Sequence, residues 1–201
     1  MKHIKKTSLL FLLSLFGGLA LSSCTVDEPT VVKPKTIDQY KQEFSQFVTS
    51  ECATVRSCKV GYDKGNFIPV SATSFASYTS AYLTALIADS AVIAKPNVTI
   101  AELAVANTTV TVPGKAFWGK INIADKRALN DLIVTATTLN NTAAVGTLTG
   151  NVPQDAKTKF ATAIATATTT RDALTTIDRQ VTDGITALNL SIKAFTDAII
   201  K

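Results

Sequence analysis

Apolar residues recur every three or four positions along most of the chain, which is the period of an amphipathic helix. The clearest case is the last segment, whose apolar seam consists of Ile177, Val181, Ile185, Leu188, Ile192, Phe195 and Ile199. Threonine is frequent and lowers helix propensity by roughly a few tenths of a kcal/mol per residue. The helical period nevertheless spans each segment, whereas strand-like alternation does not. We therefore expect an all-α fold.

Six segments with this period lie between residue 36 and the end of the chain. Helix-start signals mark all six, because Ser, Thr and Asp cap helices and proline is tolerated in a first turn. The predicted starts are Thr36 with Gln39 in a capping box, Ser74, Thr99, Asp125, Pro153, and Thr175 or Thr176. In the third helix, Pro113-Gly114 is expected to kink or break the helix, because proline removes a donor and clashes with the preceding turn.

The same turn sequence occurs twice. Residues 60–66 read VGYDKGN and residues 145–151 read VGTLTGN, an offset of 85, and each copy separates two predicted helices. Later in each half, residues 115–117 and 193–195 both read KAF. Gly-Asn turns could recur by chance, but the shared order of elements favours duplication. We expect two tandem three-helix bundles, over 36–122 and 123–201, that could pack end to end.

The first 35 residues have a different character. Met1 to Lys6 is basic, and an apolar run from Leu9 to Leu21 follows, which is the order of a secretory signal. This run is too short to cross a hydrocarbon core of about 30 Å as a helix. Residues 25–35 read TVDEPTVVKPK, whose prolines and mixed charges predict an extended tether over 24–35.

The signal ends in Leu21-Ser22-Ser23-Cys24, which resembles the lipobox of bacterial lipoproteins. This resemblance implies removal of residues 1–23 and lipidation of Cys24, usually followed by a second acylation at the new terminus. Two or more acyl chains hold a protein on a membrane where one does not. The alternatives are an ordinary signal peptide with an accidental cysteine, or an uncleaved anchor.

Cleavage at this point changes what the composition allows. The whole chain has 20 Lys and Arg against 15 Asp and Glu, but the balance is 17 to 15 once Lys2, Lys5 and Lys6 leave. No basic stripe remains, so a nucleic-acid partner is not expected. The only histidine, His3, also leaves. Its loss excludes catalysis that depends on histidine and zinc sites that contain histidine. The acids are scattered and no Gly-rich phosphate loop occurs, so we expect no enzyme, cofactor or metal.

Cys52 and Cys58 remain once Cys24 is lipidated. Secretion exposes thiols to oxidising conditions, so we expect these two to form a disulfide, provided that their α-carbons approach within about 7 Å. Two free thiols are the alternative.

Five residues are candidates for ligand binding. Trp118, the only tryptophan, could stack on a sugar or simply pack against the core. The other four lie in the more polar copy of the repeated loop and are Tyr62, Asp63, Asn66 and Phe67. Loops often carry function, although turn chemistry alone could also explain these residues.

The second half carries a pattern of core and turn residues that resembles a known module. The pattern comprises Leu132-Ile133, Ala136, Gly150-Asn151-Val152-Pro153, Ala156-Lys157, Phe160, Ala163-Ile164, Ala167, Thr176, Gln180-Val181, Ile185, Ala187-Leu188 and Ile192 to Phe195. It resembles the FIVAR module of bacterial surface proteins. The first half fits loosely, because Pro113-Gly114 interrupts its third helix and the cysteine pair is atypical. The resemblance implies a non-catalytic accessory or adhesive module that contacts carbohydrate or host-matrix components.

These observations predict a lipid-anchored, non-catalytic envelope protein that binds an extracellular carbohydrate or protein. A structural spacer or assembly subunit without a small ligand is the alternative. Asp27-Glu28, close behind Cys24, resembles the surface-export signal of lipoproteins in one group of Gram-negative bacteria. We therefore expect an outer-membrane location, on the cell surface rather than the periplasmic side.

Overall fold

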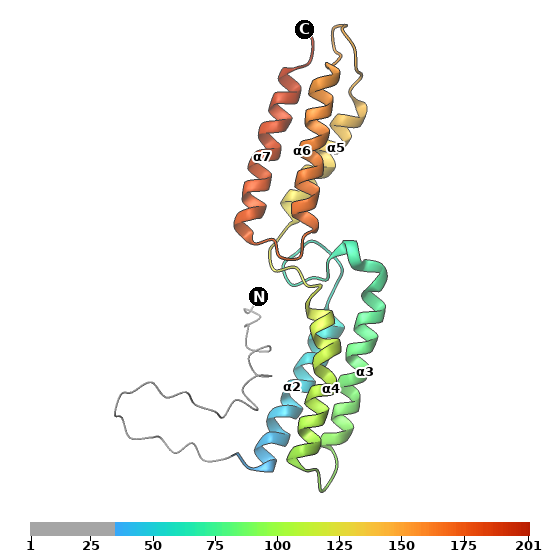
Figure 1. The fold of residues 1–201 in the computed structure, drawn as a ribbon, viewed down its shortest axis with the longest axis vertical. Helices are drawn as coiled ribbons and strands as arrows, with labels where there is room; N and C mark the ends of the chain where they lie inside the picture. Colours follow the sequence, from blue (N-terminus) through green and yellow to red (C-terminus); the bar gives the residue numbers. More distant parts are fainter. Residues whose placement is uncertain (1–34) are drawn as a thin grey trace, which may run out of the picture. The chain divides into compact units, whose positions relative to one another are not determined.

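The computed structural model describes residues 35–201. The predicted signal, its lipobox at Cys24 and almost all of the predicted tether lie outside these residues. Six α-helices and one short 3-10 helix make up the described chain, which contains isolated β-bridges but no strands (Figure 1). The elements are α2 (Ile37–Ser57), η1 (Pro69–Ser74), α3 (Phe75–Ile93), α4 (Ile100–Trp118), α5 (Arg127–Thr142), α6 (Gln154–Asp172) and α7 (Asp178–Asp197). The predicted all-α fold is confirmed.

The described residues divide into two compact units. The first unit contains residues 35–57 and 77–118, and the second contains residues 58–76 and 119–201. The division therefore does not follow a single cut in the sequence, because the segment between α2 and α3 belongs with the second unit. Each unit contains three long helices.

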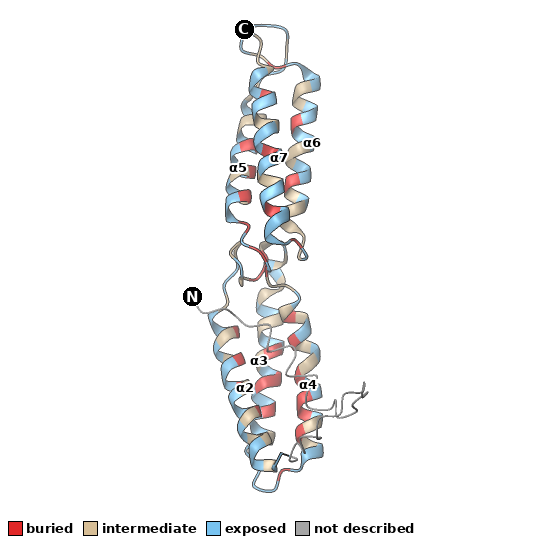
Figure 2. Ribbon diagram, turned by 90° about the vertical axis from the view of Figure 1, so that its left-hand side faces the viewer, coloured by how far each residue is buried: buried red, intermediate tan, exposed pale blue. Residues whose placement is uncertain are grey.

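In the second unit, α5, α6 and α7 pack against one another along their lengths. Buried residues lie in a stripe on each helix, as the helical period requires (Figure 2). The core consists of Leu129, Ile133, Ala136, Val152, Phe160, Ala167, Val181, Leu188 and Phe195 with Ala124. The rings of Phe160 and Phe195 stack with their centroids 4.4 Å apart, which joins α6 to α7.

In the first unit, α2, α3 and α4 are joined through aromatic and polar side chains. The ring of Tyr82 on α3 lies 5.8 Å from that of Phe117 on α4, and its hydroxyl donates to Glu51 on α2. A Cβ added to Gly114 would lie 3.0 Å from the Tyr82 ring. The glycine therefore allows α4 to approach α3 closely.

Two of the predicted helix caps are confirmed. The Thr36 amide donates to Gln39 at 2.9 Å and the Gln39 amide donates to the Thr36 hydroxyl at 3.3 Å. Thr99 and Glu102 make the same reciprocal pair at the start of α4. The predicted cap of α7 is wrong, because Thr176 is buried and donates its hydroxyl to the Thr170 carbonyl at 2.6 Å. Ile177 takes the cap position, and its amide donates to Gln180.

Pro113 does not break α4, which continues through it to Trp118. The residues that follow the proline explain why. Gly114 and Phe117 are both buried in the first unit. Keeping them there offsets the backbone hydrogen bond that Pro113 cannot make.

Candidate functional site

The two copies of the repeated turn fold into the same loop. Each loop contains three backbone hydrogen bonds, and each bond in the first loop has a counterpart 85 residues later in the second. In the first loop they run from Gly61 N to Phe67 O (3.0 Å), Asn66 N to Asp63 O (3.1 Å) and Phe67 N to Lys59 O (2.8 Å). In the second they run from Gly146 N to Val152 O (3.1 Å), Asn151 N to Leu148 O (3.0 Å) and Val152 N to Ala144 O (2.9 Å).

The chain that follows the third helix of each copy closes the loop in the same way. Asn122 accepts from the Gly65 amide and donates to the Asn66 carbonyl, both at 2.9 Å. Ile200 accepts from the Gly150 amide at 2.8 Å and donates to the Asn151 carbonyl at 2.9 Å. The structural repeat therefore includes the end of the third helix as well as the turn.

In the second unit, the tip of the first loop packs against the end of the bundle where α5 begins and α6 ends. The Arg171 guanidinium carbon lies 4.9 Å from the centroid of the Tyr62 ring. The Lys126 amide donates to the Tyr62 carbonyl at 2.8 Å, and Asp63 pairs with Arg127 at 3.0 Å. These contacts hold the candidate loop against the second bundle.

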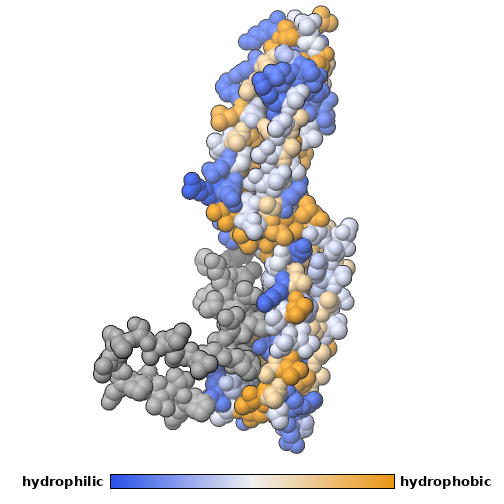
Figure 3. All heavy atoms as spheres, in the orientation of Figure 1, coloured by the Kyte–Doolittle hydropathy of each residue, from blue (hydrophilic) through white to orange (hydrophobic). Residues whose placement is uncertain are grey.

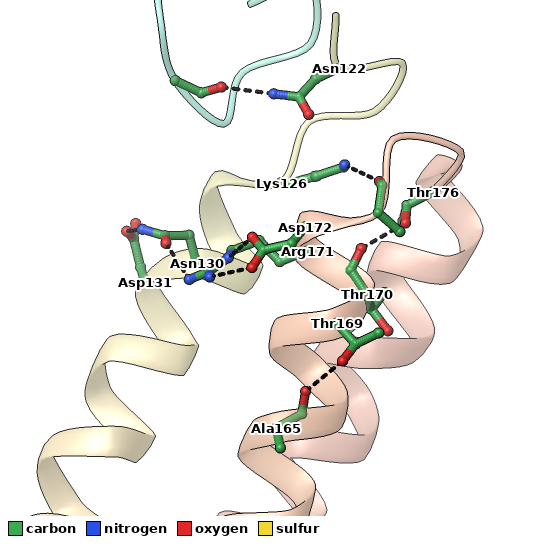
Figure 4. A network of polar contacts seen from close by, with 12 residues as sticks. Asn122, Lys126, Asn130, Asp131, Ala165, Thr169, Thr170, Arg171, Asp172 and Thr176 are labelled. Atoms are coloured by element: carbon green, nitrogen blue, oxygen red, sulfur yellow. Dashed lines mark hydrogen bonds and ion pairs between the residues drawn. The ribbon is translucent and has the colours of Figure 1, made fainter. Parts of the chain in front are cut away.

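Figure 4 shows the polar network below this loop. Arg171 forms a bidentate salt bridge with Asp172, with N–O distances of 2.7 and 3.0 Å, and it also donates to the Asn130 side chain. Lys126 is completely buried and its Nζ donates to the Ala173 carbonyl at 2.6 Å. Burial lowers the pKa of Lys126, and the nearby Asp172 partly offsets this effect. The network fixes the end of α6 to the start of α5.

The four loop candidates are thus engaged within the second unit. Tyr62 is half-buried under Arg171, and Asp63 accepts from the Asn66 side chain at 3.0 Å as well as pairing with Arg127. Phe67 is completely buried and makes an edge-to-face contact with Phe75, with ring centroids 5.0 Å apart. The Phe67 ring is therefore part of the core, whereas the other three loop candidates keep some exposed surface.

Trp118 belongs to a different group, in the first unit. Its indole Nε1 donates to the Glu51 carboxylate at 3.0 Å, and its ring meets Phe117 edge to face at 5.2 Å. Tyr82 donates to the same carboxylate oxygen at 2.7 Å. Burial and the neighbouring Glu51 charge raise the pKa of Tyr82 well above its usual range. Trp118 and the four loop candidates therefore belong to different units.

A second buried carboxyl, that of Asp89, lies on α3 two turns beyond Tyr82. Asp89 is 1% exposed, and its Oδ2 makes no hydrogen bond within the described chain. Burial raises the pKa of this carboxyl from 3.8 to about 7. No other feature of the described residues marks a ligand at Asp89.

Cys52 and Cys58 are free thiols, so the predicted disulfide is wrong. Cys52 lies within α2 and Cys58 directly follows its last residue. The five helical steps from Cys52 to Ser57 already advance roughly 7.5 Å, beyond the approach of about 7 Å that a disulfide needs. The Cys58 thiol instead faces the carbonyls of Lys59 and Gly65, and burial raises its pKa.

Sequence reasoning missed Lys126 and Arg171, the two cations around which the loop contacts are built. One signal could have found the lysine. Lys41 precedes Lys126 by the repeat offset of 85 and makes the matching bond, from its Nζ to the Lys95 carbonyl at 3.2 Å. No comparable signal marks Arg171, whose counterpart in the first copy is apolar.

Residues 35–201 contain no cluster of three or more His, Cys, Asp or Glu suited to a metal ion. None of the helices in that range is both long enough and apolar enough to cross a membrane. No family model, curated protein or solved structure matches the chain. The fold and the contacts above therefore define the class as an all-α protein with an internal structural repeat.

Proposed function

We propose that this chain is a lipid-anchored, non-catalytic protein of the cell envelope whose helical units act as a spacer or assembly subunit. One observation carries the choice of a structural role. All five side chains that suggested ligand binding make contacts within the chain. Tyr62 contacts Arg171 and Asp63 pairs with Arg127. Asn66 bonds to Asp63, Phe67 lies in the core, and Trp118 donates to Glu51. The lipobox-like sequence ending at Cys24 supports the anchor.

Metabolic labelling with radioactive palmitate tests the anchor. The wild-type chain is expected to incorporate label and to remain in the membrane fraction, whereas Cys24→Ser is expected to lose both properties. Cys58→Ser is the matched control, because it removes a different thiol and should leave labelling unchanged. Equal labelling of wild type and Cys24→Ser would reject the proposed lipid site.

A binding module for carbohydrate or protein is the second candidate function. The FIVAR resemblance supports it, as does the partial exposure of Tyr62 and Trp118. Glycan arrays and pull-downs from surface extracts separate the two functions. A specific ligand whose binding falls at least tenfold in Tyr62→Ala or Trp118→Ala would establish binding and reject a purely structural role.

Surface exposure is part of the proposal and rests on Asp27-Glu28 behind the lipid site. Protease treatment of intact cells tests it. Digestion of the anchored chain supports the cell surface, provided that a periplasmic marker protein remains intact. Full protection would place the chain on the periplasmic side.

A further inference from the structure

Within the second unit, a loop tip and a bundle end form complementary surfaces. We call residues 62–64 the first tip. The second base is the bundle end that is formed by the starts of α5 and α7 and the end of α6. The first tip makes three side-chain contacts with this base. They are Tyr62 with Arg171 (4.9 Å to the ring centroid), Asp63 with Arg127 (3.0 Å) and Lys64 with Asp178 (3.4 Å).

The structural repeat supplies each of these surfaces a second time. The second tip is residues 147–149, at the same place in the second loop, and all three residues are exposed. The first base is the bundle end formed by the starts of α2 and α4 and the end of α3. Its lysine bond, from Lys41 to the Lys95 carbonyl, matches that from Lys126 to the Ala173 carbonyl in the second base. The two bases are therefore built on the same plan.

The chemistry of tip and base changes together between the copies. The charged and aromatic tip Tyr62-Asp63-Lys64 corresponds to the uncharged Thr147-Leu148-Thr149. In the bases, Arg127 corresponds to Gln42 at the offset of 85. By position in the helix, Arg171, next to the last residue of α6, corresponds to Val92 in α3, and Asp178, the first residue of α7, corresponds to Ile100 in α4. A charged tip on an uncharged base would lose its hydration without gaining a partner. The uncharged second tip suits the first base, which lacks the three charged groups that contact the first tip.

Exposure points in the same direction. Leu148 is 73% exposed at the second tip, and Ile100 is 50% exposed at the first base. Hydrophobic residues lie exposed elsewhere on the described chain as well (Figure 3). The first base carries the charges of Lys41, Lys95 and Glu102, and each has a partner within it: Lys41 donates to the Lys95 carbonyl at 3.2 Å, and Lys95 pairs with Glu102 at 3.0 Å. A neutral apolar tip can therefore approach without removing the partner of any of these three charges.

The two bases differ at the start of the first helix. Helix α2 begins at Ile37, five residues before the position that matches the start of α5 at Arg127. Lys41 consequently lies inside a helix, where its amide bonds to the preceding turn. The backbone contact from the Lys126 amide to Tyr62 then has no counterpart. A contact at the first base must rest on side chains, and we expect it to be weaker.

From these observations we infer that copies of this chain associate head to tail, the second tip of one copy docking on the first base of the next. This inference builds on the assembly role proposed above and names a second copy of the chain as the partner. The two surfaces differ, so the interface is heterologous and leaves one tip and one base available for further copies.

Sedimentation of the purified full chain in a mild detergent tests this inference. The wild-type chain is expected to form dimers and larger species as its concentration rises. Leu148→Asp removes the apolar tip and Ile100→Asp removes the apolar base, so each variant alone is expected to remain monomeric. Leu190→Asp is the matched control, because it charges a leucine in the middle of α7 that is 65% exposed, between Ile100 and Leu148, and it should associate like wild type.

Mixing the two variants distinguishes head-to-tail contact from a symmetric dimer. Each variant keeps one working surface, so an equimolar mixture is expected to form dimers and nothing larger. A symmetric interface would not recover in the mixture. Circular dichroism of each variant confirms that the helical fold is retained.

A wild-type chain that stays monomeric up to about 1 mM, where an interface of about 4 kcal/mol would already be half occupied, overturns the inference. So does association that both charged variants retain. Neither result affects the lipid anchor, because palmitate labelling of Cys24 tests that proposal separately.

Discussion

At the scale of single residues, each repeated loop depends on a glycine in the left-handed region of backbone conformation. Gly65 has φ of 89° and Gly150 has φ of 88°, where a residue with a Cβ is strained. A second glycine in each loop makes room for an asparagine. A Cβ on Gly61 or Gly146 would lie 2.9 or 2.5 Å from the Nδ2 of Asn66 or Asn151. The repeated glycines are thus explained by backbone conformation at Gly65 and Gly150 and by a close asparagine side chain at Gly61 and Gly146.

Substitution of Gly150 by alanine isolates the backbone term, because no atom lies within 4 Å of the added Cβ. We expect Gly150→Ala to reduce the free energy of unfolding by about 1–2 kcal/mol. Gly184→Ala is the matched control inside α7, where the added Cβ meets Leu129 at an ordinary 3.6 Å. That variant should gain roughly 0.5–1 kcal/mol. Urea unfolding followed by circular dichroism measures both changes, and equal signs would contradict the prediction.

Asp89 predicts a pH dependence of stability. The folded carboxyl keeps its proton up to a pKa of about 7, whereas the ordinary value is 3.8. Its contribution to stability is therefore full below about pH 4 and is lost as the pH rises to about 7. Asp89→Asn should be as stable as wild type at pH 4. At pH 8 it should be more stable by roughly 1–3 kcal/mol, the usual cost of an unpaired buried polar group.

Thermal unfolding at pH 4, 6 and 8 tests this prediction. Asp183→Asn, at an exposed position on α7, provides the control and should follow the wild-type profile within about 0.5 kcal/mol. A wild-type stability that rises between pH 4 and 7 while Asp89→Asn stays flat would show that the carboxyl is stabilised by an unseen partner.

At the scale of elements, the packing of α4 favours a continuous helix although its local sequence does not. Pro113 disfavours a continuous helix, yet the buried Gly114 and Phe117 and the bond from Trp118 to Glu51 all require the last turn. The α7 cap shows the same priority, because Thr176 serves the end of α6 instead of its own helix. In both cases contacts with another element outweigh a local preference.

Replacing Pro113 therefore relieves a cost that the fold already bears. Pro113→Ala restores an amide donor in α4 and should raise the free energy of unfolding by about 1–3 kcal/mol. Pro153→Ala is the matched control, because Pro153 directly precedes α6 and blocks no helical hydrogen bond. Its effect should stay below about 1 kcal/mol. A destabilised Pro113→Ala would mean that the proline shapes α4 for its packing.

At the scale of the whole molecule, the two copies share a plan but use it in different surroundings. The lysine near the start of the first helix of each copy bonds to a carbonyl after the second helix, at 3.2 Å for Lys41 and 2.6 Å for Lys126. Lys126 is completely buried, whereas Lys41 is only half-buried. The tip of the first loop accounts for the difference, because it covers the second base.

The two lysines should consequently differ in their effect on stability. Lys126→Met leaves the Ala173 carbonyl buried without a donor and should cost about 1–3 kcal/mol. Lys41→Met leaves a carbonyl that water can reach, so its cost should stay below about 1 kcal/mol. Chemical denaturation of both variants gives the comparison. Equal losses would indicate that the tip of the first loop does not seal the second base.

The sequence by itself determined the helical class, six helices to within a few residues at most ends, and the repeated turn. Each of these follows from short-range physics. The helical period reports which face is buried, caps such as Thr36 and Thr99 satisfy backbone groups within the next turn, and glycine allows a positive φ. The lipobox-like segment and its consequences also rest on sequence and remain predictions.

Only the tertiary structure decided which polar residues meet. The bonds of Glu51 join residues 31 and 67 positions apart, and Arg171 reaches Tyr62 from another element. Such pairs depend on how helices pack, which no local pattern encodes. Packing also carried α4 through Pro113. The free tip at Leu148 and the free base at Ile100 likewise became visible only once the first loop was seen packed on the second bundle.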